Sequence, residues 1–467
     1  MELKRNIGLF TAVCVIVGNM IGTGIFGTTG YALADMGQAG LVLVLWLIGG
    51  AAAIAGALSY AELASIWPEV GGEYVYLKNT FGKLPAFMTG WVSLTVGFSA
   101  AVAACALVFT EYLANFMTSV AADSLFADAV FQKFLAAGII VFFSCMHIMG
   151  VRRGTLLQNI LTVIKVLIVL ALVIGGLIAA GGAHTERLSA GFDAQAASLA
   201  GGLAWILHPT APVPALPEIA LTLLIVMFAY SGWNASAYIA GEIKDPAKNL
   251  PRALFWSAFG IMVVYFLFNI VYLLAVPIEE LAGQGAVGAV AAGGLFGPEA
   301  ARFFSLGIAV ILLSAISSQI FIGPRVSYAM ARDRMLFRSL GALHERYETP
   351  HRAILLQAAV SITYIFLGSA EMLMQYMGFA LSVFPLIAVA GLIVLRIRRP
   401  DLARPWKVPL FPLFPAIYIA LTLIMMIASL LAWTSTSLFA LLVLAASVPV
   451  YYIWRFFAMT RLDAPRV

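Results

Sequence analysis

Two short stretches of this sequence place glycines and polar residues inside otherwise apolar segments. They are residues 21–25 and residues 228–234. A helix interrupted at such a point leaves backbone groups without partners. The N–H groups where a helix resumes stabilise an anion, and the carbonyl groups where a helix ends can accept hydrogen bonds from a cation. The pair predicts a site for a zwitterion, with its carboxylate at the first stretch and its ammonium at the second.

The backbone groups expected to bind are the N–H groups of residues 23–25 and the carbonyl groups of Phe228, Ala229 and Ser231. Backbone that is not helical at membrane depth is tolerated only where it lines a cavity, so a cavity is expected between the two stretches. The predicted binding residues are Ile21, Gly22, Thr23, Gly24, Ile25, Phe228, Ala229, Ser231 and Asn234.

The glycines of the first stretch have two other interpretations. Residues 22–27 match the G-x-G-x-x-G pattern of dinucleotide-binding folds, but that motif needs a preceding strand in a soluble unit, and the apolar surroundings exclude it. The spacing of Gly18 and Gly22 also fits close packing of membrane helices through small residues. Unwinding and close packing are both compatible with the sequence.

Lys165 is the one basic residue placed inside an apolar segment, residues 155–181. A lysine at the centre of a membrane helix costs about 2.5–3.5 kcal/mol on insertion scales, so it needs a structural or functional reason. One alternative is that the side chain reaches the cytoplasmic end of its helix, since it follows Thr155 by ten residues.

The composition of the chain indicates whether these residues lie in water or in a membrane. The 467 residues are 62% hydrophobic and 10% charged, with a mean hydropathy of +0.99, whereas soluble domains are about 25% charged. The chain is therefore expected to be one integral membrane domain over residues 1–467, without a cleavable signal peptide. Its +5 charge is attributed to loops and not to nucleic-acid binding. The cysteines, Cys14, Cys105 and Cys145, have no metal-site or disulfide spacing, and neither a metal nor a cofactor is expected.

Apolar windows of about 20 residues, the length of a membrane helix, predict twelve spans. They lie near residues 9–33, 40–66, 85–115, 134–150, 155–181, 217–242, 253–276, 302–331, 353–369, 371–395, 411–433 and 436–457. With the amino terminus inside, 23 of the 27 Lys and Arg residues fall in inner segments. The outer segments then hold Lys133, Arg187 and Arg302. Because basic residues accumulate on the cytoplasmic side, both termini are expected there.

The two interrupted spans are the first members of two successive groups of five. Inverted repeats of this kind, with binding sites at broken helices near the midplane, characterise many secondary transporters. The sequence therefore predicts repeat one at about 7–181, repeat two at about 217–396 and extra helices at about 411–457.

Several stretches resemble the amino acid–polyamine–organocation transporters, and most of all their L-type amino acid transporter branch. They are 22–26, 228–234, 60–63, 71–77, 241–246, 249–253 and 325–329, followed by Thr349-Pro350. The resemblance implies an all-α membrane fold of the LeuT type, with five spans, five inverted spans and two more, helices 1 and 6 unwound, and alternating access.

The resemblance also implies roles for single residues. The backbone of residues 22–24 would take the substrate carboxylate, Phe228 would close the outer gate, and Ser231 and Asn234 would flank the side-chain pocket. Lys165 would bond carbonyl groups of the first span in place of the sodium ion of sodium-coupled relatives, and would couple site occupancy to gate closure. Ser231 stands where many relatives have glycine, which predicts a smaller or more polar pocket wall.

The leading expectation is exchange of neutral L-amino acids across the plasma (inner) membrane. The alternatives are proton-coupled symport through Lys165 and carriage of cationic amino acids or polyamines. Residues 228–234 hold no acidic side chain to meet a second positive charge, which argues against cationic substrates. A membrane enzyme would need a cluster of catalytic side chains in the spans, and none is evident.

The remaining predictions concern a partner protein, the polar residues outside the two stretches and one outer loop. The loop at 116–133 lacks the cysteine through which animal L-type members are implied to bind a heavy chain, so a stand-alone bacterial carrier without a disulfide-linked partner is expected. Its oligomeric state is left open. Glu62 and Glu111 are expected to be structural, and residues 314–319 form a polar patch that faces either the substrate or its own helix. Residues 182–216 are expected to be an extended outer loop.

Overall fold

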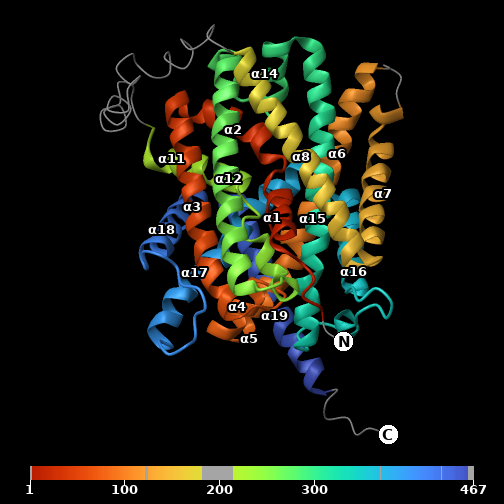
Figure 1. Cartoon of the computed structure of the whole chain (residues 1–467), viewed down its shortest axis with the longest axis vertical. Coiled ribbons are helices and arrows are strands. Elements are labelled where there is room, and N and C mark those ends of the chain that lie inside the picture. Colours follow the sequence, from red (N-terminus) through yellow and green to blue (C-terminus); the bar gives the residue numbers. More distant parts are fainter. Residues whose placement is uncertain (1–2, 121–124, 181–213, 369, 433, 461–467) are drawn as a thin grey trace.

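The computed structural model describes residues 3–120, 125–180, 214–368, 370–432 and 434–460. Within these residues the chain is helical, and two isolated bridges, Ile7 with Ile243 and Val70 with Ile239, are the extended pairings. The long helices stand side by side in one bundle (Figure 1). The predicted all-α membrane class is confirmed in this part of the chain.

Nine helices of the described residues are long and apolar enough to cross a membrane. They are α3 (Ala39–Ile66), α5 (Lys83–Val92) continuing through the π-helix η1 (Ser93–Phe98) into α6 (Ser99–Val120), α7 (Ala129–Ile148), α8 (Val151–Ala179), α12 (Pro246–Ala275), α15 (Pro298–Arg332), α17 (Ala370–Arg398), α18 (Leu413–Ala432) and α19 (Thr434–Thr460). The shorter helices are α4 (Glu73–Phe81), α11 (Leu216–Ala229), α13 (Ile278–Leu281), α14 (Val287–Phe296) and α16 (His351–Leu367), with 3-10 turns η2 (Leu125–Ala127), η4 (Ala235–Tyr238), η5 (Ala240–Glu242) and η6 (Arg338–Gly341).

The interruptions predicted in spans 9–33 and 217–242 are both present. Helices α1 (Leu9–Met20) and α2 (Gly24–Met36) meet at a bend of 42° and together count as a tenth span. Helix α11 ends at Ala229 and is followed by the short turns η4 and η5. Because α11 has 14 residues and α16 has 17, neither reaches the length of a full span. The described helices thus include nine long spans and one bent pair, and the prediction of twelve spans from hydropathy is not settled by them.

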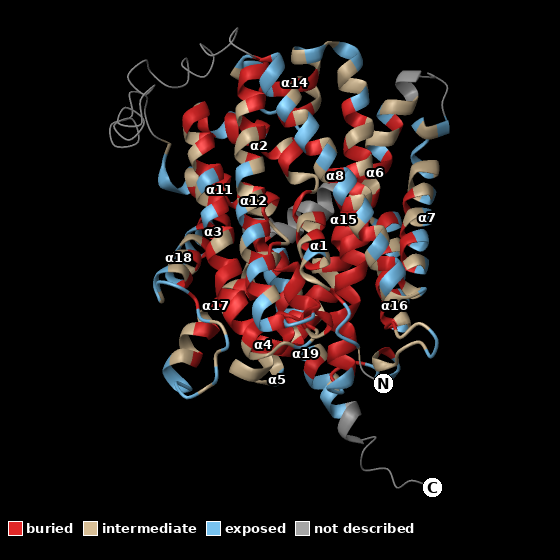
Figure 2. Cartoon of the chain, in the orientation of Figure 1, coloured by how far each residue is buried: buried red, intermediate tan, exposed pale blue. Residues whose placement is uncertain are grey.

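The helices divide into an inner and an outer set. The apolar windows of α15 and of α5 with α6 are 78% and 72% buried, whereas those of α7 and α8 are 22% and 28% buried. Figure 2 shows the same division, with exposed residues on the outer helices and buried residues at the centre around α1. The outer helices expose large apolar side chains such as Leu156, Leu167 and Ile178, as contact with lipid requires.

The sequence of α8 determines which of its faces points inward. Its buried residues, Gln158, Thr162, Lys165, Val169 and Val173, recur every three or four positions, which is the spacing of one helix face. The lipid-exposed residues lie on the other face. A polar stripe of this kind is costly in lipid, so packing turns it toward the bundle, and this orientation carries Lys165 to α1.

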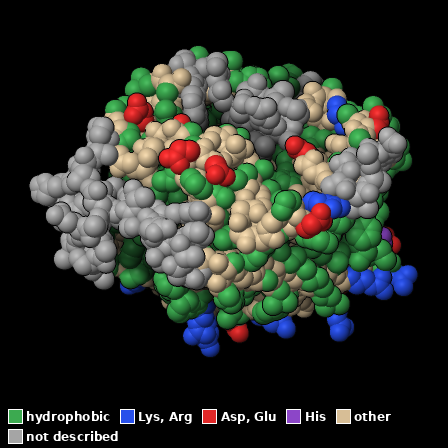
Figure 3. All heavy atoms as spheres, turned by 90° about the horizontal axis from the view of Figure 1, so that it is seen from above, with side chains coloured by type: hydrophobic (Ala, Val, Ile, Leu, Met, Phe, Trp, Pro, Cys, Tyr) green, Lys and Arg blue, Asp and Glu red, His purple; other side chains and the backbone are tan. Residues whose placement is uncertain are grey.

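One end of the bundle carries the first described residues and the end of α19 (Figure 1). There the N–H of Ile7 donates to the carbonyl of Glu242 at 2.9 Å, and Lys244 N–H donates to the carbonyl of Ile7 at 2.9 Å. Figure 3 shows the opposite face from above, where acidic side chains lie toward the middle of the face and basic side chains lie mainly along its edge. Of the predicted outer loop, residues 182–213, including Arg187, lie outside the described residues.

Two buried carboxylates hold helices and loops together near the end of the bundle that carries the first described residues. Glu242 pairs with Arg325 of α15 at 2.8 Å, and both side chains are 1% exposed. Glu62 pairs with Arg396 at 2.6 Å, lies 3.4 Å from Arg404, and accepts the N–H of Val408 at 2.7 Å. Glu62 thus joins α3 to α17 and to the segment before α18, as expected for a structural residue. Glu111 is exposed.

Replacement of Glu242 by Gln should lower the thermal stability of the detergent-solubilised protein. The change leaves the buried Arg325 without its counter-charge, and breaking such a pair costs about 3–5 kcal/mol. The measurement is the midpoint of thermal unfolding, with Glu299→Gln as the matched control because its pair with Arg302 is largely exposed and contributes about 0–1 kcal/mol. Equal midpoints for the two variants would contradict a stabilising role for the buried pair.

Candidate functional site

The break between α1 and α2 exposes backbone donors. Ile21 leaves the helix with φ −76° and ψ 95°, and α2 resumes at Gly24. The N–H of Phe26 donates to the carbonyl of Thr23 at 3.2 Å. Within the described part of the chain, the N–H groups of Gly22, Gly24 and Ile25 have no acceptor. Since the start of α2 carries a partial positive charge, these groups form an anion-binding end.

The carbonyl groups of α1, in contrast, are bound by side chains from four neighbouring elements. Ser236 of η4 donates to Ala12 O at 2.7 Å, Thr162 of α8 to Cys14 O at 3.1 Å, Ser318 of α15 to Val15 O at 2.9 Å and Tyr265 of α12 to Met20 O at 2.7 Å. Met20 O lies at the end of α1, where an unpaired carbonyl would cost several kcal/mol, and the other three carbonyls gain a second hydrogen bond beside the one within the helix.

Lys165 supplies the donors closest to the break. Its Nζ lies 2.7 Å from the carbonyl oxygen of Gly18 and 2.6 Å from that of Ile21. The residue is 0% exposed, so the alternative that it reaches the cytoplasmic end of its helix is wrong. The predicted bond between Lys165 and the carbonyl groups of the first span is confirmed.

The second break, at the end of α11, differs from the prediction in its carbonyl groups. Phe228 O accepts the N–H of Ser231 at 3.0 Å, and Ala229 O lies 3.2 Å from Tyr265 Oη. Both were expected to be free. Phe228 O has one of its two acceptor positions left, whereas Ala229 O competes with Met20 O, at 2.7 Å from Tyr265 Oη, for a single hydroxyl hydrogen. The carbonyl of Ser231 has no donor among the described residues.

The two breaks lie against each other. A Cβ added to Gly24 would be 2.6 Å from Ala229 Cα, so only glycine allows this approach. Gly232 has φ +92°, and a Cβ there would collide with the Asn19 amide. Gly18 packs tightly against Gln158, whereas Gly22 faces open space. Close packing and unwinding are therefore both present, at different glycines of the same stretch.

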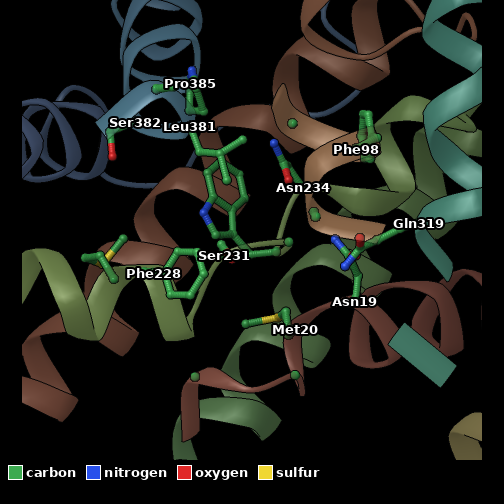
Figure 4. Close-up of a pocket in the computed structure, with 18 of the residues that line it drawn as sticks. Asn19, Met20, Phe98, Phe228, Ser231, Asn234, Gln319, Leu381, Ser382 and Pro385 are labelled. Carbon is green, nitrogen blue, oxygen red and sulfur yellow. The ribbon is translucent and has the colours of Figure 1, made fainter. Parts of the chain in front are cut away.

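A cavity of about 150 Å³ lies beside the two breaks, large enough for a molecule of about the size of benzene. Figure 4 shows the Phe228 ring on one side and the carboxamides of Asn234, Gln319 and Asn19 on another. The π-helix η1 contributes Ser93, Gly97 and Phe98 to the wall, and α17 and α18 complete it. The described residues contain no group of three or more His, Cys, Asp and Glu that could hold a metal ion.

Most of the predicted binding residues line this cavity. Those that do are Gly22, Thr23, Gly24, Phe228, Ala229, Ser231 and Asn234. Ile21 and Ile25 do not line it, and their side chains are 2% and 1% exposed in the apolar core. Lys165 lies outside the lining and contacts the backbone of the first break.

Two contributors, Glu73 and Tyr265, were missed by sequence reasoning. Glu73, at the start of α4, lines the cavity and accepts hydrogen bonds from Asn234 Nδ2 at 2.8 Å and Tyr238 Oη at 3.0 Å. Tyr265 bridges the two breaks. Glu73 lies in the stretch 71–77, but nothing local indicates that it approaches Asn234, which is 161 residues away.

The polar patch of α15 follows neither predicted alternative as a whole. Ser314 contacts Thr162, Ser317 contacts His147, and Ser318 bonds α1, so these hydroxyls join helices to one another. Gln319 alone of the patch lines the cavity. The patch is therefore mainly a set of interhelical bonds.

Comparison with known proteins reveals similarity along nearly the whole chain. The family model described as "Amino acid permease" matches residues 7–454. The b(0,+)-type amino acid transporter 1 of Mus musculus is 30% identical over 459 residues, covering 98% of this chain and 89% of that protein. The Large neutral amino acids transporter small subunit 2 of Homo sapiens is 31% identical over 456 residues, with 97% and 80% covered. The Asc-type amino acid transporter 1 of Mus musculus is 29% identical over 460 residues, with 97% and 82% covered.

Replacement of Gly24 by Val should abolish amino-acid binding while the protein still folds, because the side chain would push α2 away from Ala229. Binding is measured as thermal stabilisation by a panel of neutral amino acids, with Gly24→Ala as a milder change and Gly260→Ala as control. A Cβ at Gly260 meets nothing within 4 Å. Retained affinity in a folded Gly24→Val protein would remove this close approach from the binding site.

Proposed function

Because the chain belongs to the amino acid permease family, whose members here are amino acid transporters, we propose that it exchanges neutral L-amino acids by alternating access. Amino acid transport follows from the family. The lining of the cavity holds no Lys, Arg or His among the described residues, which argues against anionic substrates, but it does hold Glu73. The choice of neutral over cationic substrates rests on the relative whose name specifies large neutral amino acids.

The observation that carries the proposal is the division of the cavity into donor and acceptor ends. The free N–H groups of Gly22, Gly24 and Ile25 would bind the α-carboxylate at the start of α2. The carbonyl of Ser231 and the remaining acceptor positions of Phe228 and Ala229 would bind the α-ammonium. The Gly24–Ala229 approach brings these two ends within reach of one small zwitterion.

Lys165 would couple the site to the movement of the helices. It connects α8 to the carbonyl groups on both sides of the end of α1, so a shift of α2 on substrate binding would change its hydrogen bonds. A lysine cation provides in one side chain the positive charge that a bound sodium ion would supply. Phe228, which lines the cavity from the end of α11, would close the site on the outer side.

The membrane arrangement is part of the same proposal. Twelve spans in two inverted groups of five, at about 7–181 and 217–396, with two further helices, are supported by breaks at the first member of each group. Cytoplasmic termini in the plasma membrane are supported by the basic residues of the inner segments. The absence of cysteine from 116–133 supports a carrier without a disulfide-linked partner.

Uptake of labelled amino acid into liposomes should be slow when the lumen is empty and should rise sharply when it contains unlabelled amino acid. The physical reason is that the binding site of an exchanger returns to the outer side only when it carries a substrate from the lumen. The measurement compares initial rates with and without internal substrate, at equal and at unequal pH across the membrane. Equal rates with empty and loaded liposomes, or uptake driven by the pH difference alone, would favour symport instead.

Replacement of Lys165 by Ala should reduce the transport rate by about tenfold or more while changing binding affinity less, since about 1.4 kcal/mol corresponds to a factor of ten in rate. The variant loses the two hydrogen bonds to the end of α1, but not the N–H groups of the break. Exchange rates and binding constants are measured in parallel, with Lys248→Ala as control because that lysine is exposed at the start of α12. Unchanged exchange in Lys165→Ala would exclude this residue from coupling.

A further inference from the structure

Glu73 is a buried acidic residue at the cavity that has no cationic partner among the described residues. It is 4% exposed, and its carboxylate accepts hydrogen bonds from Asn234 Nδ2 at 2.8 Å, Tyr238 Oη at 3.0 Å and Thr89 Oγ1 at 3.4 Å. Removing one carboxylate from water is expensive unless donors surround it. Three neutral donors do so here.

These contacts determine which way the Asn234 amide faces. A carboxylate only accepts hydrogen bonds, so it holds the amide nitrogen of Asn234 and turns the amide oxygen away. The nitrogen also lies 3.4 Å from Tyr238 Oη, on the same side. Figure 4 shows the oxygen of Asn234 on the side of Gln319 and Asn19, with the nitrogen opposite. Within the described residues, no donor meets this oxygen.

Gln319 provides a second acceptor in the same cavity. Its Oε1 is buried and has no partner among the described residues, and its Nε2 has one weak contact, with Cys105 Sγ at 3.8 Å. The side chain is 8% exposed and lines the cavity. A buried acceptor without a donor is costly, so a ligand that supplies the donor is favoured over one that does not.

We propose that Glu73 is a positioning residue, which fixes the Asn234 oxygen toward the cavity so that the site selects small neutral amino acids whose side chain carries a hydrogen-bond donor. This inference rests on the proposed transport function and specifies its substrate class. A hydroxyl group on a short side chain fits a cavity of about 150 Å³. A cationic side chain would have to share the Glu73 carboxylate with the three neutral donors whose hydrogen bonds it already accepts, which leaves about one of its roughly four acceptor positions.

Threonine and valine test the inference in the unmodified protein, since they are nearly equal in shape and differ in the hydroxyl. The wild-type protein should bind threonine about two- to tenfold more tightly than valine, because one added hydrogen bond contributes about 0.5–1.5 kcal/mol. The measurement is isothermal titration calorimetry in detergent. Equal affinities, or tighter binding of lysine than of threonine, would overturn the inference without any variant.

The role of Glu73 is tested by Glu73→Gln, which keeps the size of the side chain but can donate to Asn234. The amide of Asn234 can then turn over, and the ratio of the affinity for threonine to the affinity for valine should fall toward one. The double variant Glu73→Gln with Asn234→Asp should restore the preference, because an aspartate has two acceptor oxygens and the introduced glutamine can donate to one of them. Thr89→Val removes a different donor to Glu73 and should keep the wild-type preference.

The outcomes separate this inference from the proposed function. If the wild-type protein neither binds nor exchanges any neutral amino acid, both fail together. If it exchanges amino acids but Glu73→Gln keeps the threonine preference, only the positioning role is wrong. A purely structural role of Glu73 would weaken the binding of threonine and of valine by the same factor, so the ratio of their affinities in Glu73→Gln would equal that of the wild-type protein.

Discussion

The structure depends on one constraint: a helix broken inside a lipid-embedded bundle must have its backbone groups satisfied by other parts of the protein. Five side chains from α8, α12, α15 and η4 bind carbonyl groups of α1 and its end, and Lys165 alone binds two of them. The free N–H groups at the start of α2 have no equivalent partners among the described residues. This asymmetry leaves donors available for a ligand where acceptors are already occupied.

The same constraint accounts for the polar residues of the bundle core. Thr162, Ser236 and Ser318 would each be costly in an apolar interior without a partner, but each donates to a carbonyl of α1, where it adds a second hydrogen bond to one within the helix. Tyr265 serves both breaks, because its hydroxyl lies within hydrogen-bond distance of Met20 O and Ala229 O. The two interruptions are thus one structural unit, joined by α12 and by the contact of Gly24 with Ala229.

Charged residues divide by function in a similar way. Glu62 and Glu242 are paired with arginines and hold elements at one end of the bundle. Glu73 has neutral donors only among the described residues, and it lies at the cavity. A paired carboxylate stabilises a connection, whereas an unpaired one influences the orientation of its donors and the electrostatic potential of the cavity.

The sequence by itself determined the membrane class, most span positions and the places where two spans could be interrupted, because hydropathy and glycine content are local properties. The inward direction of Lys165 was decided by the structure. Most residues expected to line the site also do so, since they lie within the interruptions themselves. Tertiary structure decided that Tyr265 Oη lies within hydrogen-bond distance of Ala229 O, that Ile21 and Ile25 face the core, and that Glu73 meets Asn234. These contacts join residues far apart in the chain, and only the packing of whole helices brings their side chains within hydrogen-bond distance.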